Sequence, residues 1–126
     1  MRAVYKSAKP YADDALNLPV KDLESAIPYY ERTFGFRVVS RHTSPHARAI
    51  LARNDVQIGL AENGGDPTQD GCFFEVDDVE AAYAEINGRS AAPGAIKGHR
   101  AYGRQYHAFF VVAPDGLCYL IAQPAD

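Results

Sequence analysis

The residues best able to do chemistry in this chain are four histidines, two cysteines and several carboxylates. His42 and His46 have the spacing of two ligands on one helix face, but Ser44-Pro45 lies between them and precludes a helix. Cys72 and Cys118 fit neither a CxxC motif nor zinc-site spacing. No serine lies in a nucleophile elbow, and no glycine-rich phosphate loop follows a strand. These patterns favour neither covalent catalysis nor a metal centre built from these side chains.

Composition narrows the choice of partner. The 126 residues are 47% hydrophobic and 23% charged, which predicts one soluble globular domain over residues 1–126. A net charge of −3 without a basic stripe argues against nucleic acid as a partner. Apolar runs are far shorter than the ~20 residues that span a membrane. The N-terminus lacks the apolar segment of a signal peptide, so we expect a cytoplasmic protein that binds no membrane.

The elements that must position any site can be read from periodicity. The first ten residues are polar and predicted to be loosely held. Alternation predicts a strand over residues 15–20, with Leu16, Leu18 and Val20 on one face. A helix capped by Asp22 follows and stops at Gly35, and starting it near Glu24 places Pro28 in its first turn. Three strands come next, the last two joined by a tight turn at Asn54-Asp55.

The same pattern then begins again. Residues 72–82 repeat residues 16–26 at a shift of 56, and residues 108–121 repeat residues 47–60 at a shift of 61. This predicts two strand-helix-strand-strand-strand modules, at about residues 14–62 and 70–123. Because neither module alone buries much core, we expect their sheets to pack together.

Strand alternation also assigns each side chain to a face. One face of each sheet is apolar and packs on the helices, whereas the other is mixed. The mixed face includes Asn17, Arg48, Gln57, Phe73 and Glu75, and a two-residue turn at 115–116 adds Cys118, Leu120, His107 and Phe109. Such a mixture suits the wall of a cavity, although an ordinary half-exposed sheet face is the alternative.

Three stretches resemble a known family: LPVKDLESAIPYYERTFGF (18–36), FEVDDVEAAYAEI (74–86) and YGRQYHAFFVVAPDGLCYLI (102–121). They are similar to the vicinal oxygen chelate (VOC) superfamily of glyoxalase I, bleomycin-resistance proteins and extradiol dioxygenases. The resemblance implies an α+β fold in which two tandem βαβββ modules form a cupped mixed β-sheet with helices on the outer face. It also implies that a dimer partner completes the cup.

The resemblance further identifies the positions where metal-dependent members carry their ligands. Carried over to this chain, these positions are Ala15, Gly59, Gly71 and Leu120, none of which can bind a metal ion. The chain is therefore closest to the metal-free, bleomycin-resistance-like branch, and we expect no cofactor. The YGRQY segment resembles the WGR-type stretch of that branch, with Tyr102 as its aromatic residue.

These observations predict a metal-independent small-molecule-binding protein that is a homodimer. Its ligand would be an antibiotic or a related cationic or aromatic compound. The predicted binding residues are Asn17, Arg48, Gln57, Phe73, Glu75, Tyr102, His107 and Phe109. One alternative is a VOC-type enzyme (lyase, isomerase or dioxygenase-like) with a displaced metal or with Glu75 or His107 as acid or base. Another is a metabolite-binding regulatory domain.

Overall fold

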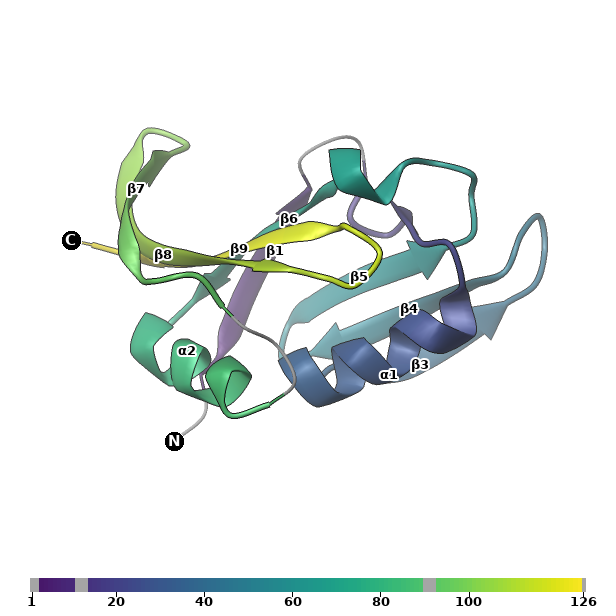
Figure 1. Ribbon diagram of the computed structural model, residues 1–126, viewed down its shortest axis with the longest axis horizontal. Helices are drawn as coiled ribbons and strands as arrows, with labels where there is room; N and C mark the ends of the chain where they lie inside the picture. Colours follow the sequence, from purple (N-terminus) through teal and green to yellow (C-terminus); the bar gives the residue numbers. More distant parts are fainter. Residues whose placement is uncertain (1–2, 11–13, 90–92, 126) are drawn as a thin grey trace.

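The computed structural model describes residues 3–10, 14–89 and 93–125. Within these ranges the chain forms two α-helices, a short 3-10 helix η1 and nine strands, coloured along the sequence in Figure 1. In chain order they are β1 (Tyr5–Pro10), β2 (Leu18–Pro19), α1 (Leu23–Phe34), β3 (Arg37–His42), β4 (Arg48–Arg53), β5 (Val56–Ala61), η1 (Pro67–Gln69), β6 (Gly71–Val76), α2 (Val79–Asn87), β7 (Lys97–Ala101), β8 (Arg104–Val112) and β9 (Cys118–Pro124). Neither helix in these ranges is long and apolar enough to cross a bilayer.

The two sheets share one topology. The four-stranded sheet has the order β2-β5-β4-β3, and the five-stranded sheet has the order β1-β6-β9-β8-β7. In each, the first strand of the repeat lies parallel to the last, and the other pairs are antiparallel. The structure therefore confirms the predicted α+β class and the tandem βαβββ organisation. β1 is an additional edge strand that pairs with β6.

The helix boundaries follow from capping. Asp22, as predicted, and Asp78 are the N-caps of α1 and α2, and each side chain accepts a backbone N–H of the first turn. Gly35 ends α1 with φ 71°, a left-handed conformation that glycine adopts without steric cost. The expected place of Pro28 is wrong, because α1 starts at Leu23 and Pro28 lies in its interior. Its ring therefore removes one intrahelical hydrogen bond.

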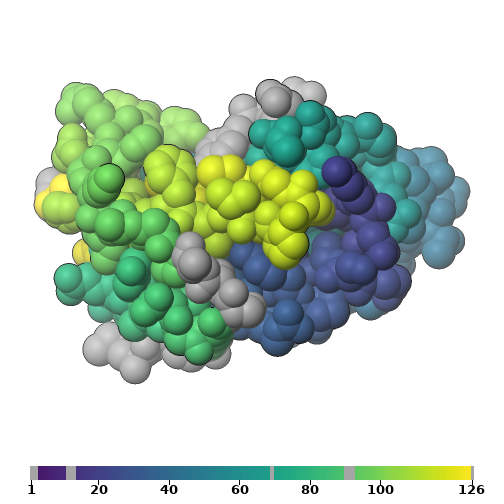
Figure 2. All heavy atoms as spheres, viewed as in Figure 1, coloured from purple at the N-terminus to yellow at the C-terminus, as the bar shows by residue number. Residues whose placement is uncertain are grey.

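A single aromatic core joins the repeats. The ring of Tyr119 in β9 stacks on Phe74 of β6 at 5.2 Å and meets Phe34 of α1 edge-on at 5.4 Å. The hydroxyl groups of Tyr30 and Tyr119 share a buried hydrogen bond of 2.5 Å. In Figure 2, yellow atoms of the C-terminal part of the chain lie directly against the blue atoms of α1.

The expectation of a loosely held N-terminus is wrong for residues 5–10. Tyr5 is 1% exposed, and its ring packs against Phe36 and Phe74 in the core. The guanidinium of Arg53 lies 4.3 Å from the Tyr5 ring centroid and donates to the carbonyl of Ala3. A register shift between Tyr5 and Ser7 interrupts the alternation of β1, so its pattern does not resemble a regular strand.

The first predicted strand is much shorter than expected. Only Leu18 and Pro19 form β2, and Leu16, predicted to face the helix, is 42% exposed. Asp14 causes the difference: its side chain accepts the N–H of Leu16 and its carbonyl accepts the N–H of Asn17. These bonds form a turn in place of extended backbone. Pro19, which has no N–H to donate, lies at the end of this strand.

Candidate functional site

A second, smaller apolar cluster lies on the face of the five-stranded sheet that points away from the helices. We call this side the aromatic face; its buried members are Phe73, Tyr106, Ala108, Leu120 and Ala122. They come from the three adjacent strands β6, β9 and β8, where Phe73 pairs with Leu120 and Ala108 with Ala122. In Figure 1, β7 rises out of the plane of β8 and β9, so the sheet curves around this face.

Phe73 is the centre of an aromatic trio. Tyr102 meets its ring edge-on with the centroids 5.2 Å apart, and Tyr106 does so at 5.0 Å. Edge-to-face pairs at this separation each contribute about 0.5–1.5 kcal/mol beyond the burial of area. Phe73 and Tyr106 are buried, whereas Tyr102 is 57% exposed. The trio therefore presents one accessible ring above a buried apolar floor.

The β7–β8 turn holds Tyr102 in place. Tyr102 has φ 51° and Gly103 has φ 74°, so both turn residues are left-handed. The two flanking residues, Ala101 and Arg104, pair directly, which makes this a two-residue hairpin. Asn or Gly is usual at the first position of such turns, so a tyrosine there adds backbone strain.

Charged side chains surround the trio. The ammonium of Lys9 in β1 lies 4.3 Å from the Tyr102 ring centroid, and the guanidinium of Arg104 lies 5.9 Å from that of Tyr106. Both distances allow a cation–π interaction. Glu75 pairs with Ala122 and is half-buried on the same face. The structure thus places Phe73, Glu75 and Tyr102, predicted from sequence, beside Lys9 and Tyr106, which the prediction missed.

The prediction that His107 and Phe109 lie with them is wrong. Phe109 pairs with Ile121 and belongs to the main core, where its ring lies 5.3 Å from Tyr83 of α2. His107 pairs with Gln123 and, with it, lines a cavity at the start of α2. Both side chains therefore point to the helix side of the sheet.

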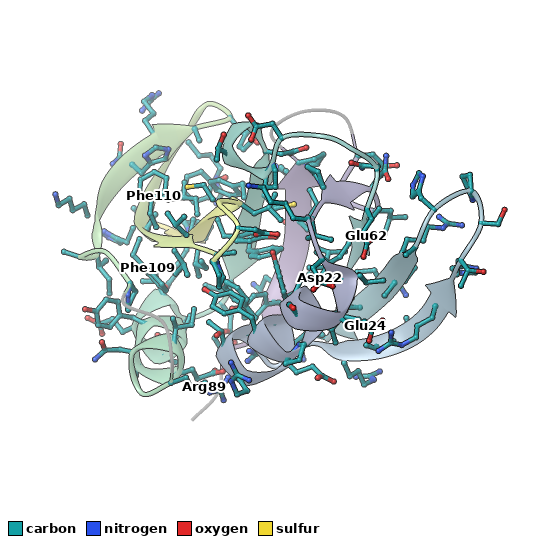
Figure 3. All side chains as sticks on the ribbon, turned by 45° about the vertical axis from the view of Figure 1, so that its right-hand side comes forward. Asp22, Glu24, Glu62, Arg89, Phe109 and Phe110 are labelled. Atoms are coloured by element: carbon teal, nitrogen blue, oxygen red, sulfur yellow. The ribbon has the colours of Figure 1, made fainter. Side chains whose placement is uncertain are left out.

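A one-residue difference in the β8–β9 turn explains the error. Ala113 donates its N–H to the carbonyl of Leu117 (2.8 Å), which leaves three residues, 114–116, in the turn. The sequence predicts a turn of two residues, and a shift of one residue exchanges the faces of a strand. Figure 3 labels Phe109 and its neighbour Phe110, which point to opposite sides of β8.

The predicted residues of the first repeat lie on other elements. Asn17 is in the turn before β2, where its side-chain and backbone oxygens accept the amide of Asn63. Arg48 and Gln57 lie on the four-stranded sheet, and the buried Nε atom of Arg48 has no hydrogen-bond partner there. Among the described residues, no hydrogen bond, ion pair or ring contact joins these three side chains to the aromatic trio.

Two of the positions that the resemblance aligns with metal ligands, Gly59 and Gly71, leave no room for a ligating side chain. A Cβ atom on Gly59 would lie 2.1 Å from the carbonyl oxygen of Leu16, and one on Gly71 would lie 1.7 Å from that of Cys118. Backbone therefore occupies the space that a ligating side chain would need at both positions. Over residues 3–10, 14–89 and 93–125, no group of three or more His, Cys, Asp or Glu side chains is placed to hold a metal ion.

The two thiols are poor nucleophiles. Burial, with a smaller contribution from the nearby Asp70, raises the pKa of the Cys72 thiol to about 12. Burial also raises the pKa of Cys118, which pairs with Gly71 on the aromatic face. Because the thiolate is the reactive form, both side chains act as small apolar residues at neutral pH.

A separate apolar cavity of about 120 Å³ lies between the start of α1 and the β8–β9 turn. Its walls include Tyr29, Tyr30 and Pro114, with Asp22 and Asp115 at the polar side. None of the residues predicted to bind a ligand lines it.

Comparison with known proteins identifies the family. Residues 14–117 match the Glyoxalase/Bleomycin resistance protein/Dioxygenase superfamily, and the chain belongs to it. This is the VOC resemblance inferred from the sequence, which is thereby confirmed. Among curated proteins, no sequence matches the chain.

Solved structures extend the comparison. TnmS3, an antibiotic-binding protein from Streptomyces sp. CB03234, is 22% identical with a TM-score of 0.73, covering 90% of this chain and 97% of its own. A bleomycin resistance determinant encoded on the transposon Tn5 is 26% identical, with a TM-score of 0.65 and coverage of 91% and 100%. A bleomycin-binding protein in complex with bleomycin is also 26% identical, with a TM-score of 0.68 and coverage of 89% and 98%.

Proposed function

We propose that this protein binds a planar aromatic small molecule on the aromatic face and sequesters it without the help of a metal. The observation that carries the proposal is the trio of Phe73, Tyr102 and Tyr106. The ring of Tyr102 is exposed, and its backbone adopts a strained left-handed conformation. Non-glycine residues held in this conformation cluster at ligand-binding sites.

The solved relatives support a binding role. TnmS3 is an antibiotic-binding protein, and another relative holds bleomycin. By analogy, the ligand here would be an antibiotic or a compound of similar aromatic character, bound in the cytoplasm. Fold alone does not fix function, so the site has to carry the argument.

The site would use each residue for one purpose. Phe73 and Tyr106 form the apolar floor, Tyr102 stacks on the ligand ring, and the charges of Glu75 and Lys9 select polar substituents. Arg48 and Gln57 lie on the other sheet and Asn17 lies in the turn before β2, so these side chains would reach the same ligand only from a second subunit.

A homodimer is therefore part of the proposal. Phe110 and Val112 are 48% and 61% exposed on β8, and they pair with Leu120 and Cys118 on the aromatic face. A second copy that covered these side chains would remove apolar surface from water and deepen the site. Sedimentation equilibrium tests this, and a strictly monomeric protein at micromolar concentration would contradict it.

Binding can be tested directly. Isothermal titration with a panel of planar aromatic antibiotics should yield at least one ligand, and Tyr102→Ala should weaken its affinity about tenfold, since one stacked ring contributes about 1 kcal/mol and its burial adds to that. Tyr83→Ala is the matched control because Tyr83 packs on the opposite side of the sheet. Equal loss in both variants would show that Tyr102 has no direct contact with the ligand.

A further inference from the structure

We propose that the ligand of the aromatic face carries a negative charge next to its aromatic ring, as an aryl carboxylate does. This inference rests on the proposed function and names the ligand class. It keeps the aromatic character of the ligand predicted from the sequence but replaces the cationic alternative with an anionic one, and the side chains around the trio are the reason.

Cations outnumber carboxylates on this face. Lys9 lies opposite Phe73 and Lys97 opposite Ala108, so both project from the same side as the buried cluster. Arg104 reaches the ring of Tyr106 from the β7–β8 turn. Glu75 is the one carboxylate that the strand pairing places among them in the described chain. Even without Arg104, Lys9 and Lys97 outnumber Glu75 among the described residues of this face, in a protein whose net charge is −3.

The chain's own cations already occupy the rings. A ligand cation attracted to Tyr102 would compete with the Lys9 ammonium at 4.3 Å from the ring centroid, and one attracted to Tyr106 would meet Arg104. Displacing either cation, or lying beside it, brings like charges within a few ångströms of each other. Like charges this close repel each other. The aromatic rings are therefore a poor receptor for a cationic ligand.

An anion gains from the same arrangement. Lys9 offers a positive charge and three N–H donors to a carboxylate. His99 lies on the same face, because it pairs with Tyr106 and its ring centroid lies 6.0 Å from that of Phe110. A nitrogen of its ring adds a further donor. An aromatic ring on Tyr102 would place an attached carboxylate among these donors, where charge-assisted hydrogen bonds form.

Three probes with one skeleton test this: 2-naphthoate, 2-naphthylmethylammonium and the neutral 2-naphthalenemethanol. Isothermal titration of the full-length protein at low salt should show the carboxylate binding at least tenfold more tightly than the ammonium, with the neutral alcohol between them. Added NaCl should weaken the carboxylate most, because salt screens exposed charges.

Variants locate the effect. Lys9→Gln should remove most of the preference for the carboxylate, whereas Lys6→Gln, at an exposed position of the same strand, should leave it unchanged. Tighter binding of the ammonium than of the carboxylate would overturn the anion proposal while leaving an aromatic binding site in place. If none of the probes and no member of the antibiotic panel binds, the proposed function itself is wrong. If Lys9→Gln and Lys6→Gln behave alike, Lys9 is not the selecting group.

Discussion

Tyr102 combines a left-handed backbone with a ring that is more than half exposed. The backbone conformation costs an L-residue roughly 1–2 kcal/mol, and the edge contact with Phe73 returns part of this. A residue chosen for stability alone would be asparagine, which tolerates this conformation in hairpin turns. The choice of tyrosine therefore indicates a use for its ring.

The substitution Tyr102→Asn separates stability from binding. Asparagine relieves the backbone strain, which stabilises the fold, but it loses the ring contact with Phe73, which destabilises it. These two effects should nearly cancel, so the free energy of unfolding should change by less than about 1 kcal/mol. Affinity for 2-naphthoate should fall about tenfold, as the stacking ring is gone. Urea denaturation and isothermal titration measure the two quantities, and undiminished binding would exclude Tyr102 from the site.

Stability should also fall at alkaline pH. The pKa of Cys72 is raised to about 12, and burial raises the pKa values of Tyr30 and Tyr119 well above 10. In the unfolded chain these groups ionise near pH 9 for the thiol and pH 10 for the phenols. The unfolded state then binds fewer protons than the folded state, so stability declines as pH rises from about 9.

Urea denaturation between pH 7.5 and 10.5 measures this decline. Each fully shifted group adds up to about 1.4 kcal/mol per pH unit to the slope. Cys72→Ala should remove most of the part that begins near pH 9, because the less buried Cys118 supplies only the remainder, and it should leave the part that begins near pH 10. A stability that is flat up to pH 10.5 would contradict the burial of these groups.

At the scale of the elements, the two β-hairpins show what sequence can and cannot predict. The first hairpin was predicted correctly, because Asn54-Asp55 is a two-residue turn and fixes the register of β4 and β5. The second was assigned the same turn length by analogy between repeats. The turn contains three residues, 114–116, which is one more than the turn of the first repeat. The prediction therefore placed Phe109 and His107 on the wrong face of β8. Periodicity gives the faces of a strand only after the turn length is known.

The candidate site was predictable to the same extent. Alternation within β6 placed Phe73 and Glu75 on the correct face because that strand begins and ends without irregularity. Tyr106 was missed because the faces of β8 had been exchanged. Lys9 was missed because residues 5–10 carry few apolar side chains, and their place beside β6 depends on pairing with a segment over 60 residues away. Only the position of Tyr102 beside a glycine signalled the β7–β8 turn.

Substituting a glycine at a position that the resemblance aligns with a metal ligand should destabilise the fold. Gly71→Ala would place a Cβ atom 1.7 Å from the carbonyl oxygen of Cys118, at a backbone φ of 152°. We expect it to lower the free energy of unfolding by at least 2 kcal/mol more than Gly98→Ala does, which is the order of a steric or backbone strain effect. Gly98→Ala is the control because its Cβ would meet only the flexible side chain of Gln105. Similar urea midpoints for both variants would show that β6 and β9 can move apart at this position without loss of stability.

At the scale of the whole molecule, the contact between Tyr30 and Tyr119 joins the two repeats. One hydroxyl comes from α1 of the first repeat and the other from β9 of the second, and both are buried. Burying the pair without their hydrogen bond would cost more than removing both groups. The bond therefore favours one way of docking the repeats.

A double-mutant cycle tests this coupling. Tyr30→Phe and Tyr119→Phe should each lower the free energy of unfolding by about 1–3 kcal/mol, because each leaves one buried hydroxyl unpaired. The double variant should lose less than the sum of the two, since it buries no unpaired hydroxyl. Urea denaturation of the four proteins gives the coupling energy. Strict additivity would mean that the hydroxyls are bonded elsewhere.

β1 has a practical consequence for work with the purified protein. This strand lies at the edge of its sheet, and the same six residues carry both Tyr5, which is in the core, and Lys9, which is at the aromatic trio. An affinity tag or fluorescent fusion placed just upstream of β1 would disturb the packing of Tyr5 and the position of Lys9 together. It would therefore change both the binding data and the melting curves. A tag that follows β9 leaves β1 untouched, but β9 ends at Pro124, opposite Tyr106 of the trio, so a tag at either end should be removed before the titrations described above.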